Sequence, residues 1–154
     1  MGFLIDEKRQ LFGLETNKTT YAFAVDNIGL LRHLYWGPKV NNLEDFDVPA
    51  LAEMSSNDPI LDLTDEEYPV FGGMRYKEHC LKVNFADGTR DIEYRYVGYT
   101  QTEETLVIHL KDAHYEFEFD LHYKVYEVQD LIERTVSVRN TGNDIIEIEK
   151  VHSG

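Results

Sequence analysis

The chain has 154 residues, of which 42% are hydrophobic and 12% aromatic, and this composition supports one domain with a proper core rather than a disordered chain. Asp and Glu number 29 against 15 Lys and Arg, so the formal net charge of -14 opposes binding to nucleic acid or to an anionic membrane surface. The N-terminus holds no apolar run of signal-peptide length and a single cysteine allows no internal disulfide, so we predict a soluble protein of a reducing compartment, most simply a cytoplasm.

The predicted elements are all β-strands, because no stretch keeps the apolar spacing of a helix over three turns. Two turns predict hairpins, one at Asp26 to Gly29 and one at the Asp-Gly pair Asp87-Gly88. In chain order the predicted strands are Gln10 to Leu14, Thr19 to Val25, Leu30 to Trp36, Cys80 to Phe85, Thr89 to Tyr99, Thr105 to Leu110, His114 to Tyr126, Leu131 to Asn140 and Ile145 to Val151. The pattern favours an all-β fold, an antiparallel β-sandwich rather than a barrel, in a single domain over residues 1–154.

The stretch from His114 to Tyr126 is the centre of this prediction, since apolar and polar residues alternate along it without a break. Successive side chains of a strand leave opposite faces, so one face belongs to the core and the other is wet or meets a polar partner. Strands usually run 3 to 10 residues. A strand of this length therefore implies a large sheet.

Residues 38–74 form a long acidic connection that contains all four prolines of the chain. From Val40 to Met74 there are nine acidic residues and no Lys or Arg. The same stretch is too apolar for a free linker, since it includes the large side chains of Leu43, Phe46, Val48, Leu51, Met54, Ile60, Leu61 and Leu63. We therefore predict a functional loop whose apolar side chains are covered by something else.

Few residues suggest chemistry of their own. The sequence has no nucleophile elbow, glycine-rich phosphate loop, cysteine pair or His-Glu-x-x-His zinc motif. Asp120 and His122 share a strand face, but a polar face rich in Glu and His is usually solvated, so we predict no metal site and no cofactor. Tyr94, Tyr96 and Tyr99 fit either a sugar-stacking platform or, on propensity alone, half-buried strands.

A set of short motifs follows in order over nearly all of the chain. The motifs are Thr20-Tyr21, Leu34-Tyr35-Trp36-Gly37, Glu67-Tyr68-Pro69-Val70-Phe71-Gly72, Ala86-Asp87-Gly88-Thr89, Arg95-Tyr96-Val97-Gly98, Glu104-Thr105-Leu106, Ile132-Glu133-Arg134 and Asn140-Thr141-Gly142. Each motif alone is weak. The ordered set resembles the N-terminal region of the family 36 glycoside hydrolases, the bacterial α-galactosidases.

The resemblance implies a supersandwich of long antiparallel strands, of the galactose-mutarotase-like type, ahead of a catalytic (β/α)₈ barrel in a tetrameric cytoplasmic enzyme. That enzyme removes terminal α-galactose with retention, using two carboxylates of the barrel. Such a barrel needs at least about 200 residues, and nothing here alternates strand with helix. We therefore expect the N-terminal fragment of a larger glycosidase, with an incomplete sandwich, no catalytic residue and no activity of its own, whose α-galactoside substrate binds through the missing barrel.

The resemblance also implies a role for the acidic loop in a homo-oligomer. Family members use the counterpart of Asn41 to Ser56 near a neighbouring subunit's active site, where an acidic residue and a following aromatic help close the sugar pocket. Here Glu53 and Met54 occupy that stretch and are the candidate substrate-binding residues, acting in trans. The other interpretation is that the loop only packs between subunits.

The chain departs from the family pattern in two places. The run Arg75-Tyr76-Lys77 begins with a basic residue where the family usually has an acidic one, and the family's insertion between Tyr99 and Glu104 is missing. The roles of those family residues therefore do not carry over to this chain.

Two other classes of function stay open. A free-standing sugar-binding module would stack aromatic side chains on a pyranose and would have no barrel. A mutarotase-like epimerase would need a His and a Glu that converge in a cleft. Spacing along the chain singles out no such pair.

Overall fold

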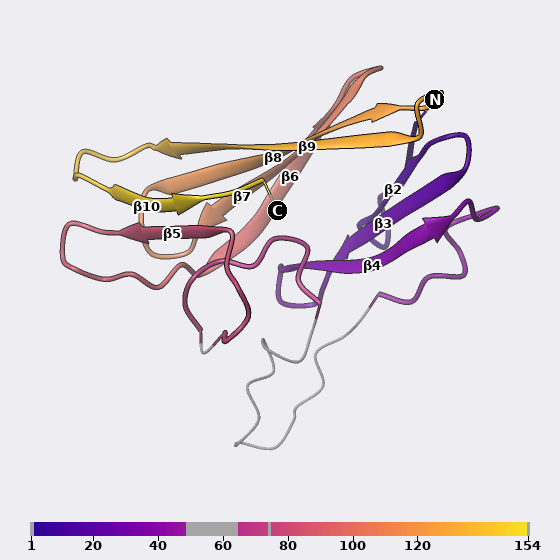
Figure 1. Cartoon of the computed structure of the whole chain (residues 1–154). Helices are drawn as coiled ribbons and strands as arrows, with labels where there is room; N and C mark the ends of the chain where they lie inside the picture. The colour runs from indigo at the N-terminus through magenta and orange to yellow at the C-terminus, as the bar shows by residue number, and fades with distance from the viewer. Residues whose placement is uncertain (1, 49–64, 74, 154) are drawn as a thin grey trace.

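The computed structural model describes residues 2–48, 65–73 and 75–153. The strands of this part are β1 (Phe3–Asp6), β2 (Leu11–Glu15), β3 (Thr19–Val25), β4 (Leu31–Pro38), β5 (Leu81–Asn84), β6 (Tyr94–Gln101), β7 (Thr105–Asp112), β8 (Phe117–Tyr126), β9 (Leu131–Asn140) and β10 (Glu147–Val151). They form three open antiparallel sheets, with the orders β1-β2-β3-β4, β6-β7-β8-β9 and β10-β5 (Figure 1). The predicted all-β antiparallel architecture is confirmed. No helix of the described residues has the length and hydropathy needed to cross a membrane.

One hydrophobic core joins the three sheets into a sandwich. Figure 1 shows the long sheet β6-β7-β8-β9 extending over both the N-terminal sheet and the β10-β5 pair. The predicted inward face of β8 is confirmed, since Phe117, Phe119, Leu121 and Tyr123 are all buried. They pack in one cluster with apolar side chains of β2, β3, β5 and β7.

Residues 66–70 link the two smaller sheets across the layer that faces the long sheet. Glu66 forms an isolated bridge to Arg32 of β4, and Val70 forms one to Leu81 of β5. Between them Tyr68 is fully buried, and its hydroxyl donates to the carbonyl of His152 over 2.7 Å. This described end of the predicted connection is therefore core structure of the sandwich.

Several predicted boundaries and one predicted hairpin are wrong. The turn at Asp87-Gly88 forms, with Gly88 at a φ of 84°, but β5 pairs with β10 and not with the strand that follows the turn. β8 starts at Phe117 rather than His114, because a carboxylate oxygen of Asp112 accepts the backbone N–H groups of His114 and Tyr115 and bends the chain away from the sheet. The first hairpin is confirmed, since β3 pairs with β4 across the turn at Asp26 to Gly29.

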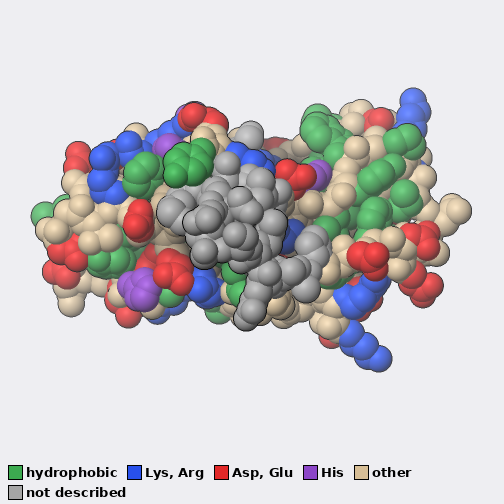
Figure 2. Space-filling model, turned by 90° about the horizontal axis from the view of Figure 1, so that it is seen from below, with side chains coloured by type: hydrophobic (Ala, Val, Ile, Leu, Met, Phe, Trp, Pro, Cys, Tyr) green, Lys and Arg blue, Asp and Glu red, His purple; other side chains and the backbone are tan. Residues whose placement is uncertain are grey.

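The start of the acidic connection packs on the outer side of the N-terminal sheet. Leu43 is buried against Leu11 and Ala24, and Phe46 and Val48 pack beside it. Figure 2 shows hydrophobic side chains gathered at the end of the molecule that carries β2, β3 and β4. The N-terminal sheet is thus covered on both faces, by the main core on one and by residues 43–48 on the other.

Candidate functional site

The buried carboxylate of Glu67 is the centre of a polar network that draws one side chain from each of four strands. The Glu67 side chain is 0% exposed. The hydroxyls of Tyr21 and Tyr123 donate to it over 2.6 and 2.7 Å, and the guanidinium of Arg134 donates over 2.7 Å. Nδ1 of His33 lies 3.2 Å from the same carboxylate. The network therefore balances and fixes a charge that would be costly to bury alone.

Strand register brings these side chains together. Tyr123 of β8 lies opposite Arg134 of β9, and Tyr21 of β3 lies opposite Trp36 of β4. The β3–β4 register then shifts at a β-bulge before it reaches His33. Because the bulge adds one residue, His33 and Trp36 line the same cleft although they are three positions apart.

The protonation states of the network follow from burial and charge. Burial, together with the charge of Glu67, raises the pKa of the Tyr21 and Tyr123 hydroxyls above its ordinary value. Burial lowers the pKa of Arg134, but the charge of Glu67 and the two tyrosines raise it, and the net shift is upward. The tyrosines therefore remain neutral donors and Arg134 remains a cation around neutral pH.

A cleft of about 700 Å³ opens beside this network. We call it the Trp36 cleft and define it by Tyr21, His33, Trp36, Leu131 and Arg134, which line it from β3, β4 and β9. Trp36 is 74% exposed, and its ring meets that of Tyr21 edge-on at 6.0 Å between centroids. Aromatic surface beside a few convergent polar groups is the usual lining of a small-ligand site.

The structure supplies the His and Glu pair that an epimerase would need, in the form of His33 and Glu67. The Glu67 oxygens, however, already accept from Tyr21, Tyr123 and Arg134 and have no exposed surface. A general acid or base must reach the substrate proton. The pair therefore supports the cleft and does not act as a general acid and base.

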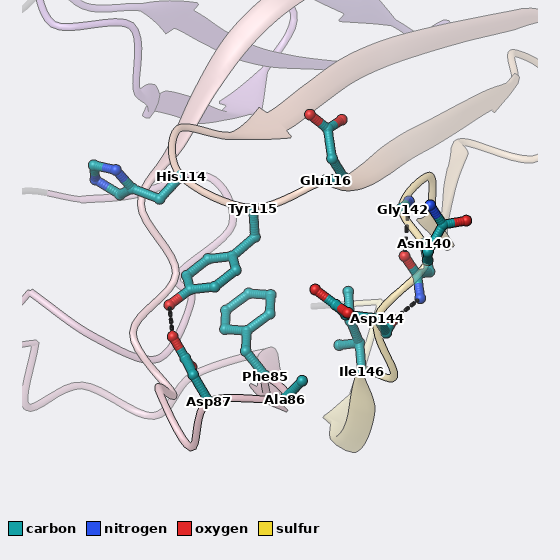
Figure 3. Close-up of a pocket in the computed structure, with 11 residues that line it drawn as sticks. Phe85, Ala86, Asp87, His114, Tyr115, Glu116, Asn140, Gly142, Asp144 and Ile146 are labelled. Carbon is teal, nitrogen blue, oxygen red and sulfur yellow. Dashed lines mark hydrogen bonds between the residues drawn. The ribbon is translucent and has the colours of Figure 1, made fainter.

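A second pocket, of about 620 Å³, lies where three loops meet at the other end of the long sheet (Figure 3). Tyr115 stacks on Phe85 with 3.7 Å between ring centroids, and its hydroxyl donates to Asp87 over 2.8 Å. Asn140 donates to the carbonyl of Asp144 over 2.7 Å and holds the neighbouring loop. The Tyr115–Asp87 bond joins two of the loops, and the backbone N–H of Thr141 donates to the carbonyl of Glu116 over 2.9 Å and joins the third, so the pocket is a structural junction.

The candidate substrate-binding residues Glu53 and Met54 lie outside the described residues. The described parts of the acidic connection before and after these two residues are both fixed to the N-terminal sheet. Leu43 packs on its outer face, and the carbonyl of Asp65 accepts the backbone N–H of His33 over 2.9 Å.

Asp120 and His122 do not come together as ligands. The carboxylate of Asp120 contacts His109 Nδ1 at 2.8 Å and Arg139 at 3.0 Å, while His122 contacts Ser137 at 2.8 Å. Among the residues that the structure describes, no group of three or more His, Cys, Asp or Glu side chains could hold a metal ion. These side chains instead form polar contacts across the strands of the long sheet.

The sugar-stacking platform proposed for Tyr94, Tyr96 and Tyr99 is wrong. Tyr94 is fully buried, and a register shift in β6 after Tyr96 turns Tyr99 toward the core as well. Tyr96 and Tyr99 pack on Phe12 with 6.2 and 5.4 Å between ring centroids. The alternative interpretation, that these are half-buried strand tyrosines, describes Tyr96 and Tyr99.

The family model and the known proteins that resemble this chain agree on one family. The model of the glycosyl hydrolase family 36 N-terminal domain matches residues 29–154. The bifunctional α-galactosidase/sucrose kinase AgaSK of Mediterraneibacter gnavus is 30% identical over 97% of this chain and 19% of its own length. α-Galactosidase 1 of Pediococcus pentosaceus is 28% identical over 97% of this chain and 24% of its own. The chain thus spans a fifth to a quarter of the length of these relatives.

Solved structures agree with the fold. The galactosidase domain of AgaSK matches with a TM-score of 0.85 and 29% identity, over 98% of this chain and 25% of that chain. The α-galactosidase AgaB from Geobacillus stearothermophilus matches with a TM-score of 0.83 and 24% identity, over 99% of this chain and 24% of that chain. At that identity the second match concerns the fold alone.

Proposed function

This chain belongs to the glycosyl hydrolase family 36 N-terminal domain family, and we propose that it serves as the non-catalytic β-sandwich domain of a cytoplasmic α-galactosidase. The longer enzyme would hydrolyse terminal α-galactosides with retention, through two carboxylates of a (β/α)₈ barrel about 5 to 5.5 Å apart. The family match over residues 29–154 carries this proposal, and the names of the relatives support it. The described residues contain strands and no helix, which agrees with a domain that contributes no part of such a barrel.

We further propose that the domain contributes to a homo-oligomer, a tetramer, through the acidic connection of residues 38–74. Arg9 supports this role, because its guanidinium donates to the carbonyls of Leu43 and Phe46 over 2.8 and 2.9 Å and ties the start of the connection to the N-terminal sheet. The other end is tied through Asp65. A segment held at both ends on one sheet suits the presentation of Glu53 and Met54 to a neighbouring subunit's sugar pocket.

The domain alone is expected to turn over no α-galactoside. A chromogenic α-galactoside incubated with the 154-residue chain should release no more chromophore than buffer does. Activity that copurifies with the chain through successive columns would contradict the proposal. The source reading frame is a second check, because it should continue into a barrel, whereas a free-standing sugar-binding module would stop near Gly154.

The role in trans is tested in the longer enzyme. Glu53→Ala and Met54→Ala are expected to raise KM severalfold while the tetramer persists, because they would weaken contacts to bound galactoside without touching the reacting carboxylates. Glu44→Ala, an exposed acidic change in the same connection, is the matched control and should leave KM unchanged. Equal kinetics in all three variants would leave the loop with a packing role only.

A further inference from the structure

Trp36 is the single tryptophan of the chain, and it stands at the Trp36 cleft with 74% of its surface exposed. Its ring is held from one side, because Tyr21 meets it edge-on at 6.0 Å and 69°. Tyr21 is itself fixed by its hydrogen bond to buried Glu67. The cleft therefore offers a large apolar plate on a rigid support, with its remaining surface open to solvent.

Two polar side chains beside Trp36 keep hydrogen-bonding capacity. Glu67 can only accept, so the proton of a neutral His33 lies on Nδ1, which faces that carboxylate at 3.2 Å, and Nε2 is an acceptor. Within the described residues no contact is assigned to Nε2. Arg134 uses Nη1 toward Glu67 and Nε toward the carbonyl of Ser153. Its Nη2 has no assigned partner in the described part of the chain and supplies N–H donors.

The charge and size of the cleft select the class of ligand. The charge of Arg134 is balanced by Glu67 at 2.7 Å, and the chain carries a formal net charge of -14, so the site does not favour an anion. Its volume of about 700 Å³ lies within the usual range of about 300 to 1,000 Å³ for small-ligand sites. A ligand with an apolar ring face and hydroxyls along its edge matches this lining. The ring face would stack on the indole of Trp36, and the hydroxyls would meet the acceptor His33 Nε2 and the N–H donors of Arg134.

We propose that the Trp36 cleft binds a neutral pyranose, stacked on Trp36, with one hydroxyl donated to His33 Nε2 and another accepting from Arg134. The cleft binds sugar without chemistry, because Glu67 is closed off beneath it. This proposal does not depend on the α-galactosidase function of a longer enzyme.

The single tryptophan makes the test specific, because all indole emission of the chain comes from the site. The 154-residue chain is titrated with galactose, glucose and their neutral disaccharides into the hundred-millimolar range, with Trp36 emission and its quenching by acrylamide as readouts. At least one neutral sugar should shift the emission saturably and protect Trp36 from the quencher. Glucuronate, an anionic sugar, should do so more weakly.

Variants separate binding from folding. His33→Ala is expected to weaken sugar binding about threefold to tenfold, the effect of one lost hydrogen bond, while circular dichroism and the melting temperature show that the fold persists. Ile145→Ala, at a residue 82% exposed and away from the cleft, is the matched control and should bind like the parent. If His33→Ala fails to fold, Trp36→Phe followed by calorimetry replaces it and should also weaken binding.

Three outcomes would overturn the proposal. The first is an emission and quenching profile that no neutral sugar changes. The second is an equal response of the parent, His33→Ala and Ile145→Ala, which would show an effect of bulk sugar on the solvent. The third is an emission shift that depends on protein concentration and not on sugar, which would make Trp36 a contact to a second copy of the chain.

Discussion

Removing the charge of Glu67 is expected to destabilise the sandwich more than removing any one of the groups that donate a hydrogen bond to it. Glu67→Gln leaves the guanidinium of Arg134 beside a fully buried neutral amide, and breaking a buried ion pair costs about 3 to 5 kcal/mol. Tyr123→Phe removes one hydroxyl and leaves Tyr21 and Arg134 in place, so it should cost about 1 kcal/mol. Urea unfolding of the three proteins measures both values. Equal losses for the two variants would mean that the charge contributes nothing beyond one hydrogen bond.

The same network predicts a loss of stability at alkaline pH. The pKa values of Tyr21 and Tyr123 are raised in the folded chain by burial and by Glu67, above the ordinary tyrosine value of 10.0. Above that value the unfolded chain binds fewer protons than the folded chain, so the free energy of unfolding falls as pH rises. It should be constant from neutral pH to about pH 9 and then decline.

Denaturant unfolding as a function of pH checks this expectation, with phenolate absorbance as a second readout. Tyr123→Phe lacks one of the two hydroxyls whose pKa is raised, so its free energy of unfolding should decline less steeply with pH than that of the parent. A parent protein whose tyrosines all ionise near pH 10 while it stays folded would contradict the buried network.

At the residue scale, the chemistry of the Trp36 cleft was not predictable from spacing. Strict alternation along a strand places His33 and Trp36 on opposite faces, because they are three positions apart. The β-bulge in the β3–β4 pairing reverses that phase, and no local residue type marks it. A second bulge in β6 acts in the same way, because it turns Tyr99 to the core side although strict alternation places Tyr99 on the face opposite to Tyr94 and Tyr96. Residue types pointed to an aromatic and polar surface, but register decided which side chains share it.

At the scale of elements, Arg9 is the anchor of the acidic connection. Its guanidinium spans from Asp6 of β1 to the carbonyls of Leu43 and Phe46. Arg9→Ala is expected to free the backbone of residues 43–48, so amide hydrogen exchange there should become about tenfold faster or more, while the strands keep their protection. Exchange followed by mass spectrometry measures it, and Lys8→Ala is the neighbouring control. Unchanged exchange in Arg9→Ala would show that the packing of Leu43 alone holds the segment.

Local turn signals predicted strand ends better than strand partners. The Asp26 to Gly29 turn joins two strands that do pair, whereas the turn at Asp87-Gly88 is followed by residues that leave the sheet. Ile92 is buried there, and its N–H donates to the carbonyl of Phe71 over 2.9 Å. The partner of β5 is β10, more than 60 residues later in the chain. Pairing at that separation depends on the packing of the whole sandwich, which a local pattern does not contain.

At the scale of the whole molecule, the fold class followed from the sequence because alternation of apolar residues is strong in β7 and β8. The role of the Glu67 to Gly72 motif, by contrast, did not follow from the sequence. Its acidic, proline-containing surroundings predicted a long functional loop, whereas Glu67, Tyr68 and Val70 are buried parts of the sandwich. Glu67 is held by Arg134, Tyr21 and Tyr123, which come from distant strands, and Tyr68 and Val70 pack in the main core, so only the assembled sandwich explains their burial.

The arrangement of the three sheets exposes β9 as an edge. β9 is ten residues long and pairs with β8 alone among the described strands, so one side of its backbone has no strand partner there. Its inward side chains Ile132, Val136 and Val138 are only half-buried against the core. An unpaired edge beside a partly covered apolar face is a template for pairing with another chain. The net charge of -14 opposes disordered aggregation, so we expect a defined dimer or higher oligomer.

Light scattering across a concentration series tests whether β9 drives this association. The mean mass should rise with concentration toward a discrete oligomer. Two proline variants, Thr135→Pro and Val136→Pro, make the test specific. Adjacent residues of a strand direct their N–H groups to opposite sides of the strand. Proline has no N–H, so each variant removes the N–H group on one side of β9. One variant loses a bond to β8 and should lower the melting temperature, while the other loses only the outward N–H and should stay folded but monomeric. A parent chain that is monomeric at every concentration would show that the charged side chains along β9 are enough to protect the edge.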